Sequence, residues 1–149
     1  MNLVVALDVS GSMAHADRQR IVGEALASLE TYLRPEDRVS FLTFAREPRL
    51  WVDGADGASV IDWVDRLLGH QPEGATNLEQ GLEEAYRTAS RHMRAGSRNR
   101  VLLMTDGAAN LGGVDAERLR RLVESRRLEG IALDVYGVGG GDYDDDLLE

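Results

Sequence analysis

The chain has 149 residues, which suits one domain with a buried core, and its 43% hydrophobic and 29% charged residues are typical of a globular protein. The net charge of −9, from 17 basic and 26 acidic residues, argues against the basic surfaces that bind nucleic acid or anionic lipid. Cysteine is absent, so disulfides and thiolate metal sites are excluded.

The first half of the chain predicts three strands and one helix. Residues 3–7 read Leu-Val-Val-Ala-Leu, which is apolar on both faces, as in a buried parallel strand. Apolar residues at helical spacing predict an amphipathic helix over 18–33, ended by Pro35. Strands follow at 39–44 and 49–52. Because a parallel crossover needs about a dozen residues, these two strands are expected to form an antiparallel hairpin at a sheet edge.

The second half alternates helices and strands. The pattern predicts helices at 60–68, at 78–93 with Thr76 or Asn77 as N-cap, and around 119–123 before a Gly130 C-cap, and strands at 101–105 and 131–138. This order predicts an α/β fold: a doubly wound, mainly parallel sheet with helices on both faces and one antiparallel edge strand. We expect residues 1–149 to form a single domain.

Three segments of the chain offer hard oxygen ligands. Asp8, Ser10 and Ser12 follow the first strand, Thr76 precedes the third helix, and Asp106 follows the fourth strand. Carboxylates and hydroxyls without nitrogen or sulfur favour Mg²⁺, Mn²⁺ or Ca²⁺ over Zn²⁺ or Cu²⁺. Open parallel sheets bind ligands at the carboxyl ends of strands, where the strand order reverses. If the first and fourth strands are neighbours there, Asp8 and Asp106 meet.

Each segment alone also has a plainer interpretation. The run from Asp8 to Ser12 can be a capped turn in which side chains bond to backbone amides, with Gly11 permitting a tight backbone. Thr76 alone is typical of a helix N-cap, and Thr105-Asp106-Gly107 is typical of a turn after a strand. The combination on the expected elements is what favours a metal site.

The combination resembles the metal-ion-dependent adhesion site of the von Willebrand factor type A family. In that family Asp-x-Ser-x-Ser is followed by a Thr and then by an Asp in a Thr-Asp-Gly context. All five positions match here: Asp8, Ser10, Ser12, Thr76 and Asp106. The likeness extends to residues 37–40 and 99–101, and it points to a bacterial branch of envelope-linked proteins.

The resemblance implies a binding module and no enzyme. The neutral hydroxyls only partly cancel the charge of the metal, so an Asp or Glu of a protein partner can complete the shell. Mg²⁺ is the expected ion, with Mn²⁺ and Ca²⁺ as alternatives. Nucleic acid and direct membrane insertion of this segment are not expected. The sequence leaves the compartment open, and the resemblance implies an extracytoplasmic or envelope-associated parent protein in a bacterium.

Two alternative functions stay open. One is aspartate-dependent phosphoryl transfer, with Asp8 as nucleophile at the end of the first strand. Against it, Ser10 stands where a second acid is usual, and the chain has no lysine to clamp a phosphate. The other is an assembly subunit of a Mg²⁺-linked ATPase complex, a role that relatives of the family serve.

The family fold usually continues with a sixth strand and a final helix. This sequence ends before both, so it looks truncated at its C-terminus, and residues 147–149 read as the first turn of a helix. The fifth strand is then expected to be a bare edge, which invites self-association through strand pairing.

Overall fold

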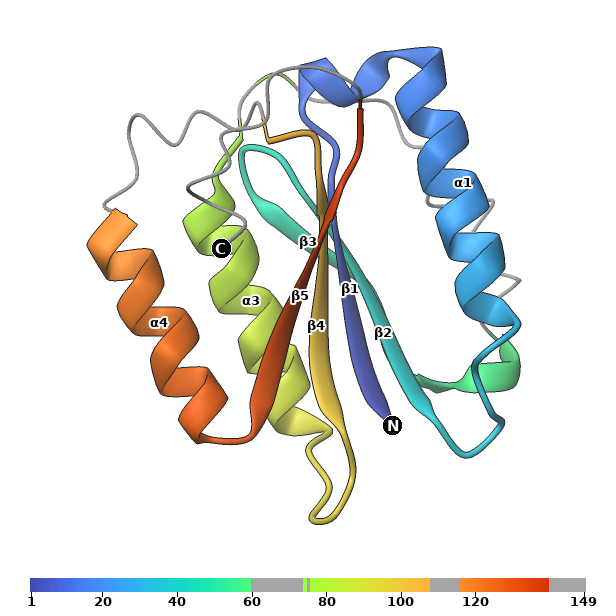
Figure 1. Cartoon of the computed structure of the whole chain (residues 1–149), viewed down its shortest axis with the longest axis vertical. Helices are drawn as coiled ribbons and strands as arrows, with labels where there is room; N and C mark the ends of the chain where they lie inside the picture. Colours follow the sequence, from blue (N-terminus) through green and yellow to red (C-terminus); the bar gives the residue numbers. More distant parts are fainter. Residues whose placement is uncertain (60–73, 75, 108–115, 140–149) are drawn as a thin grey trace.

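The computed structural model describes residues 1–59, 74, 76–107 and 116–139 (Figure 1). These residues form five strands, three α-helices and two short 3₁₀ turns. The strands are β1 (Asn2–Asp8), β2 (Arg38–Phe44), β3 (Pro48–Asp56), β4 (Asn99–Thr105) and β5 (Ile131–Gly137). The helices are η1 (Gly11–Ala14), α1 (Ala16–Glu30), η2 (Gly57–Ser59), α3 (Leu78–Arg91) and α4 (Ala116–Leu128). The helix predicted at 60–68 and the chain end at 147–149 lie outside the described residues.

The strands form one sheet in the order β3-β2-β1-β4-β5. β1 pairs in parallel with both β2 and β4, and β5 pairs in parallel with β4. β3 pairs antiparallel with β2, which confirms the predicted hairpin at a sheet edge. Helix α1 covers one face of the sheet, and α3 and α4 cover the other (Figure 1). The predicted doubly wound fold is therefore confirmed, and the strand order reverses between β1 and β4.

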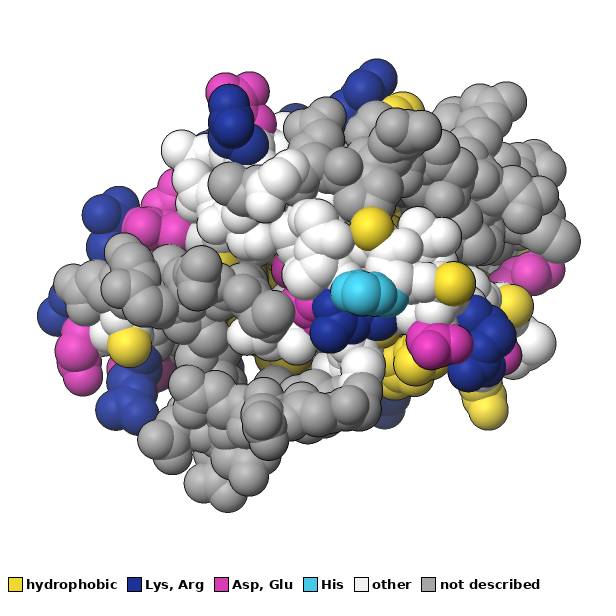
Figure 2. Space-filling model, turned by 90° about the horizontal axis from the view of Figure 1, so that it is seen from above, with side chains coloured by type: hydrophobic (Ala, Val, Ile, Leu, Met, Phe, Trp, Pro, Cys, Tyr) yellow, Lys and Arg dark blue, Asp and Glu magenta, His cyan; other side chains and the backbone are white. Residues whose placement is uncertain are grey.

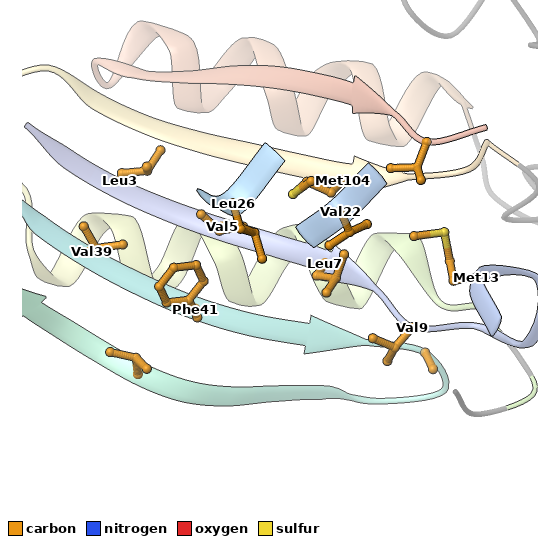
Figure 3. Packing of buried hydrophobic residues seen from close by; sticks show 13 residues of the cluster. Leu3, Val5, Leu7, Val9, Met13, Val22, Leu26, Val39, Phe41 and Met104 are labelled. Carbon is orange, nitrogen blue, oxygen red and sulfur yellow. The ribbon is translucent and has the colours of Figure 1, made fainter. Parts of the chain in front are cut away.

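The core has two layers because β1 is buried on both faces. Leu3, Val5 and Leu7 pack with Val22 and Leu26 of α1 (Figure 3). The alternate residues of β1 face the other layer, with α3 and α4. In the register of this sheet Asp8, the last residue of β1, stands beside Phe44 at the end of β2.

Helix α3 lies close against the end of β2. A Cβ placed on Gly81 would lie 2.6 Å from Cγ of Phe44, so only a glycine allows this approach. Asn77 caps the helix, because its side chain accepts a hydrogen bond from the backbone N–H of Gln80 at 3.2 Å. Of the two predicted caps, Asn77 is therefore the one that the structure uses.

Several predicted boundaries shift by a few residues. Helix α1 ends at Glu30, earlier than predicted, because the chain tightens there: the N–H groups of Tyr32 and Leu33 bond three residues back, to Leu29 and Glu30. Strand β3 runs on to Asp56 along β2. Gly130, at φ 92°, closes α4 as predicted. Among the described residues, no helix has the length and apolar character needed to cross a membrane.

Candidate metal centre

Asp8 lies at the carboxyl end of β1 and its carboxylate is held from two sides. Oδ1 accepts a hydrogen bond from the backbone N–H of Ser10 at 2.8 Å. Oδ2 accepts one from the hydroxyl of Thr105, at the end of β4, also at 2.8 Å. Asp8 has 0% exposed surface. The carboxylate is thus oriented by both neighbouring segments and shielded from solvent.

The environment of Asp8 disfavours its negative charge. Burial is the main cause that raises the pKa of this carboxyl above its ordinary value, and the nearby charge of Asp106 raises it further. The hydrogen bonds from Ser10 and Thr105 act in the opposite direction without cancelling the effect. Two carboxylates close enough to repel each other in a buried setting form an environment that a cation stabilises.

The two serines of the motif lie next to each other. Their Oγ atoms are 3.1 Å apart, on the turn that leads from β1 into η1. The N–H of Val9 donates to the carbonyl of Phe44 at 2.9 Å, which anchors the start of this turn on β2. Asp8, Ser10 and Ser12 are therefore gathered on one segment, as the spacing predicts.

Asp106 follows β4 and its side chain has 0% exposed surface. The turn after it depends on Gly107, whose φ of 71° falls in the left-handed region that favours glycine. The N–H of Gly107 donates to Thr105 Oγ1 at 3.3 Å, so the turn also orients the hydroxyl that holds Asp8. The structure thus brings Asp8 and Asp106 together at the reversal point between β1 and β4.

The neighbourhood of Asp106 contains a residue that the sequence analysis did not single out. Nη1 of Arg18, in the first turn of α1, lies 2.5 Å from Oδ2 of Asp106 and donates to the carbonyl of Ser12. The arginine belongs to none of the recognised motif positions. A cation ten residues after Asp8, at the start of the helix that follows the turn, was the available signal.

The link between Thr76 and the two candidate aspartates is less direct. It is half-buried on the loop just before the Asn77 cap, and the N–H of Asn77 donates to the carbonyl of Ala45 at 2.6 Å. The loop reaches the motif turn, since a Cβ on Gly11 would lie 3.9 Å from the carbonyl oxygen of Gly74. Within the described residues, no hydrogen bond joins Thr76 to Asp8 or Asp106.

The donor set fits a hard divalent cation. It consists of two buried carboxylates and the adjacent hydroxyls, all oxygen, as Mg²⁺, Mn²⁺ and Ca²⁺ prefer. In the part of the chain that the structure describes, no group of three or more His, Cys, Asp or Glu side chains is arranged to hold a metal ion, so the candidate site depends on hydroxyl oxygens beside its two carboxylates. Figure 2 looks onto this end of the molecule, where acidic and basic side chains lie together near the centre.

Fold and site together define a class of protein domain. Its members have an open, doubly wound α/β sheet with an oxygen-rich cluster where the strand order reverses. The sequence matches the von Willebrand factor type A domain over residues 2–149, so the chain belongs to that family. Domains of this family commonly serve in adhesion and protein interaction.

Individual relatives agree with this assignment. The protein YfbK of Escherichia coli, which is described as uncharacterized, is 33% identical over 99% of this chain. An aerotolerance-related membrane protein of Bacteroides fragilis has a TM-score of 0.73 at 23% identity, over 95% of this chain and 69% of that one. The manganese-loaded TRAP protein of Plasmodium vivax has a TM-score of 0.74 at 20% identity, over 99% of this chain and 60% of that one.

The chain is short beside its curated relatives. It spans 26% of the length of YfbK, 16% of an inter-alpha-trypsin inhibitor heavy chain H2 from Sus scrofa and 23% of complement C2 from Bos taurus. The likeness therefore concerns one domain of each relative.

Proposed function

We propose that this domain is a metal-dependent protein-interaction module. In this proposal Asp8, Ser10, Ser12, Thr76 and Asp106 hold one divalent cation, Mg²⁺ first and Mn²⁺ or Ca²⁺ as alternatives. The observation that carries the proposal is the meeting of Asp8 and Asp106 at the reversal point, with the serine hydroxyls beside them. A manganese-loaded relative of the same fold supports the choice of a hard cation.

Each residue has a role that follows from its contacts. Asp8 supplies a charged oxygen that Ser10 and Thr105 keep in one orientation. Ser10 and Ser12 supply neutral oxygens, which add no negative charge to that of the carboxylates. A bound cation acts as an electrophile toward a carboxylate. We therefore propose that the partner is a protein that presents an exposed Asp or Glu side chain.

We propose a binding role rather than an enzymatic one. A phosphoryl-accepting aspartate usually has a second acid two residues on, where this chain has Ser10, and the chain has no lysine to clamp a phosphate. A subunit role in a Mg²⁺-linked ATPase complex would use the same binding chemistry, and it is the second candidate.

The setting of the parent protein is part of the proposal. A similar structure is that of a bacterial membrane protein, and YfbK, a relative at 33% identity, is bacterial. We propose an extracytoplasmic or envelope-associated bacterial parent, with this domain carrying the interaction. Self-association through β5, which ends the sheet within the described residues, stays a prediction.

The first experiment measures the melting temperature of chelator-treated protein against Mg²⁺, Mn²⁺ and Ca²⁺. An ion that binds only the folded state raises the melting temperature by mass action. The rise should vanish in Asp8→Ala and persist in Asp53→Ala, which removes the same charge from an exposed position on β3. A parent protein that fails to respond to millimolar concentrations of any of the three ions would refute the metal-dependent part of the proposal.

The second experiment tests the partner chemistry. A peptide with one exposed Asp is titrated into the Mg²⁺-loaded domain, beside the same peptide with Asn in that position. Binding that requires both the carboxylate and the metal supports the module. Equal binding of the two peptides, or binding that survives chelation, would show that the surface recognises something other than an acidic side chain.

A further inference from the structure

Among the described residues, Arg18 brings a positive charge to the candidate centre. Its Nη1 lies 2.5 Å from Oδ2 of Asp106, a candidate ligand whose side chain has no exposed surface. The same nitrogen donates to the carbonyl of Ser12, inside the Asp8–Ser12 motif. The guanidinium therefore joins the two segments that carry the candidate ligands Ser12 and Asp106.

The segment after β5 also comes close to the Arg18 side chain. A Cβ on Gly139, after the end of β5, would lie 3.3 Å from Nε of Arg18, so the side chain also lies against a third segment. The Arg18 side chain nevertheless retains 27% of its exposed surface, while the Asp106 side chain beneath it retains none. Arg18 thus pairs with a fully buried carboxylate while its own side chain keeps partial access to solvent.

The position of Arg18 affects the charge balance of the site and its affinity for a metal. Asp8 and Asp106 repel each other in a buried setting, and one guanidinium partly compensates for the two charges. A divalent cation reaching Asp106 meets a carboxylate that already has a partner. Metal binding must then break or weaken the contact between Arg18 and Asp106, and the strength of that contact is subtracted from the affinity for the metal.

We propose that Arg18 is an internal counter-ion that competes with the divalent metal for Asp106 and thereby lowers the metal affinity of the domain. This inference rests on the proposed metal site and adds its regulation. In the metal-free protein Arg18 stabilises the pair of carboxylates. When the metal binds, the guanidinium releases Asp106 and remains a positive group at the rim of the site, where an acidic partner approaches.

The test compares Mg²⁺ affinities measured by calorimetry and melting temperatures in chelator for Arg18→Gln and the parent. We expect Arg18→Gln to bind Mg²⁺ roughly 1.5- to fivefold more tightly, the range set by one partly exposed ion pair. In chelator the variant should melt at a lower temperature than the parent, because its two carboxylates lose their counter-ion. Its rise in melting temperature on adding Mg²⁺ should be larger.

Arg20→Gln is the matched control. It removes the same charge from the same helix two residues further on, where Arg20 pairs with Glu24 on the exposed face. This variant should bind Mg²⁺ like the parent. If the Mg²⁺ affinity of both variants rises equally, the effect is one of net charge and the proposal is wrong. If Arg18→Gln binds Mg²⁺ equally or less tightly, Arg18 only holds the site together and the proposal is also wrong.

The outcome is separable from that of the metal site itself. A parent that binds Mg²⁺ while Asp8→Ala does not establishes the site, whatever Arg18→Gln does. If neither the parent nor Arg18→Gln binds Mg²⁺, both proposals fail together. Binding by Arg18→Gln alone would support the competition in its strongest form.

Discussion

The hydroxyl of Thr105 donates a hydrogen bond to Oδ2 of Asp8 at 2.8 Å, and this contact joins the carboxyl ends of β4 and β1. Gly107 donates in turn to Thr105 Oγ1 at 3.3 Å, which directs the hydroxyl hydrogen toward Asp8. Thr105 is thus a positioning residue for the first candidate ligand. Groups of this kind tune metal affinity without touching the metal.

Replacing Thr105 by Val should therefore weaken metal binding while preserving the fold. The change keeps the shape but leaves Oδ2 of Asp8 with one hydrogen bond fewer. We expect about a tenfold loss of Mg²⁺ affinity, typical of removing an orienting partner, and a loss of about 1–2 kcal/mol in stability. Calorimetric titration and denaturant unfolding measure the two effects separately.

Thr105→Ser supplies the control for that change. It keeps the hydroxyl and removes only a methyl group from the buried position. Its Mg²⁺ affinity should stay near that of the parent although its stability falls. If Thr105→Val and Thr105→Ser weaken Mg²⁺ binding equally, packing rather than the hydrogen bond determines the geometry of Asp8.

The raised pKa of Asp8 predicts a pH dependence in the metal-free protein. A carboxyl whose pKa is higher in the folded than in the unfolded state contributes stability below its unfolded pKa. That contribution is lost as the pH rises through the folded pKa. At neutral pH the ionised Asp8 should thus destabilise the chelator-treated domain. Asp8→Asn, which keeps the shape and removes the charge, should relieve that cost.

The measurement is the difference in unfolding free energy between Asp8→Asn and the parent in chelator. The unfolding free energy of the variant should rise relative to that of the parent as the pH increases from about 4, near the ordinary pKa of an aspartate, toward neutrality. Adding Mg²⁺ at neutral pH should reverse the order, since only the parent binds it. A difference that does not vary with pH would mean that Asp8 keeps an ordinary pKa.

The loop before α3 allows capping and metal binding to be separated. Asn77 accepts the hydrogen bond from Gln80, so Asn77→Ala should cost about 1 kcal/mol of stability with Mg²⁺ affinity little changed. Thr76→Ala should have the opposite pattern. It should lower stability by less than about 0.5 kcal/mol but lower the Mg²⁺ affinity by about tenfold or more. Thermal unfolding with and without Mg²⁺ distinguishes them. If Thr76→Ala leaves the Mg²⁺ affinity intact, Thr76 is not a ligand.

The sequence predicts the fold because its signals are local and strong. The double burial of residues 3–7 and the short turn between 39–44 and 49–52 suffice for a parallel sheet with an antiparallel edge. The meeting of Asp8 and Asp106 follows once β1 and β4 are neighbours, which the reversal of strand order in doubly wound sheets makes foreseeable. Motif and topology indicate the same place.

Other features depend on contacts between distant segments. Arg18 pairs with Asp106 across 88 positions of sequence, and no spacing rule links an arginine in a helix to a turn after a remote strand. The sequence pattern suggests that Gly11 permits a tight backbone, but the structure does not require a glycine at this position. Gly11 has no positive φ, and a Cβ there would only reach ordinary contact distance from Gly74. The glycine that the site turn requires is Gly107, whose role depends on the backbone path after β4.

The contact between Gly81 and Phe44 also joins segments that are distant in the sequence, and it affects the stability of the domain. Gly81 stands inside helix α3, where alanine would ordinarily stabilise the helix by about 1 kcal/mol. Here the added Cβ would lie 2.6 Å from the Phe44 ring, so the helix or the ring must shift, at a cost of about 1–3 kcal/mol. We expect Gly81→Ala to be net destabilising by denaturant unfolding.

A double-mutant cycle with Phe44→Leu tests the cause. Leucine in place of the ring should give the new methyl group room, so Gly81→Ala should cost less in the Phe44→Leu background, with a coupling of at least about 0.5 kcal/mol. Additive costs would mean that the ring is not the obstacle. Because Phe44 also anchors the motif turn through its carbonyl, the parent and Gly81→Ala should differ in Mg²⁺ affinity too if the helix displaces the end of β2.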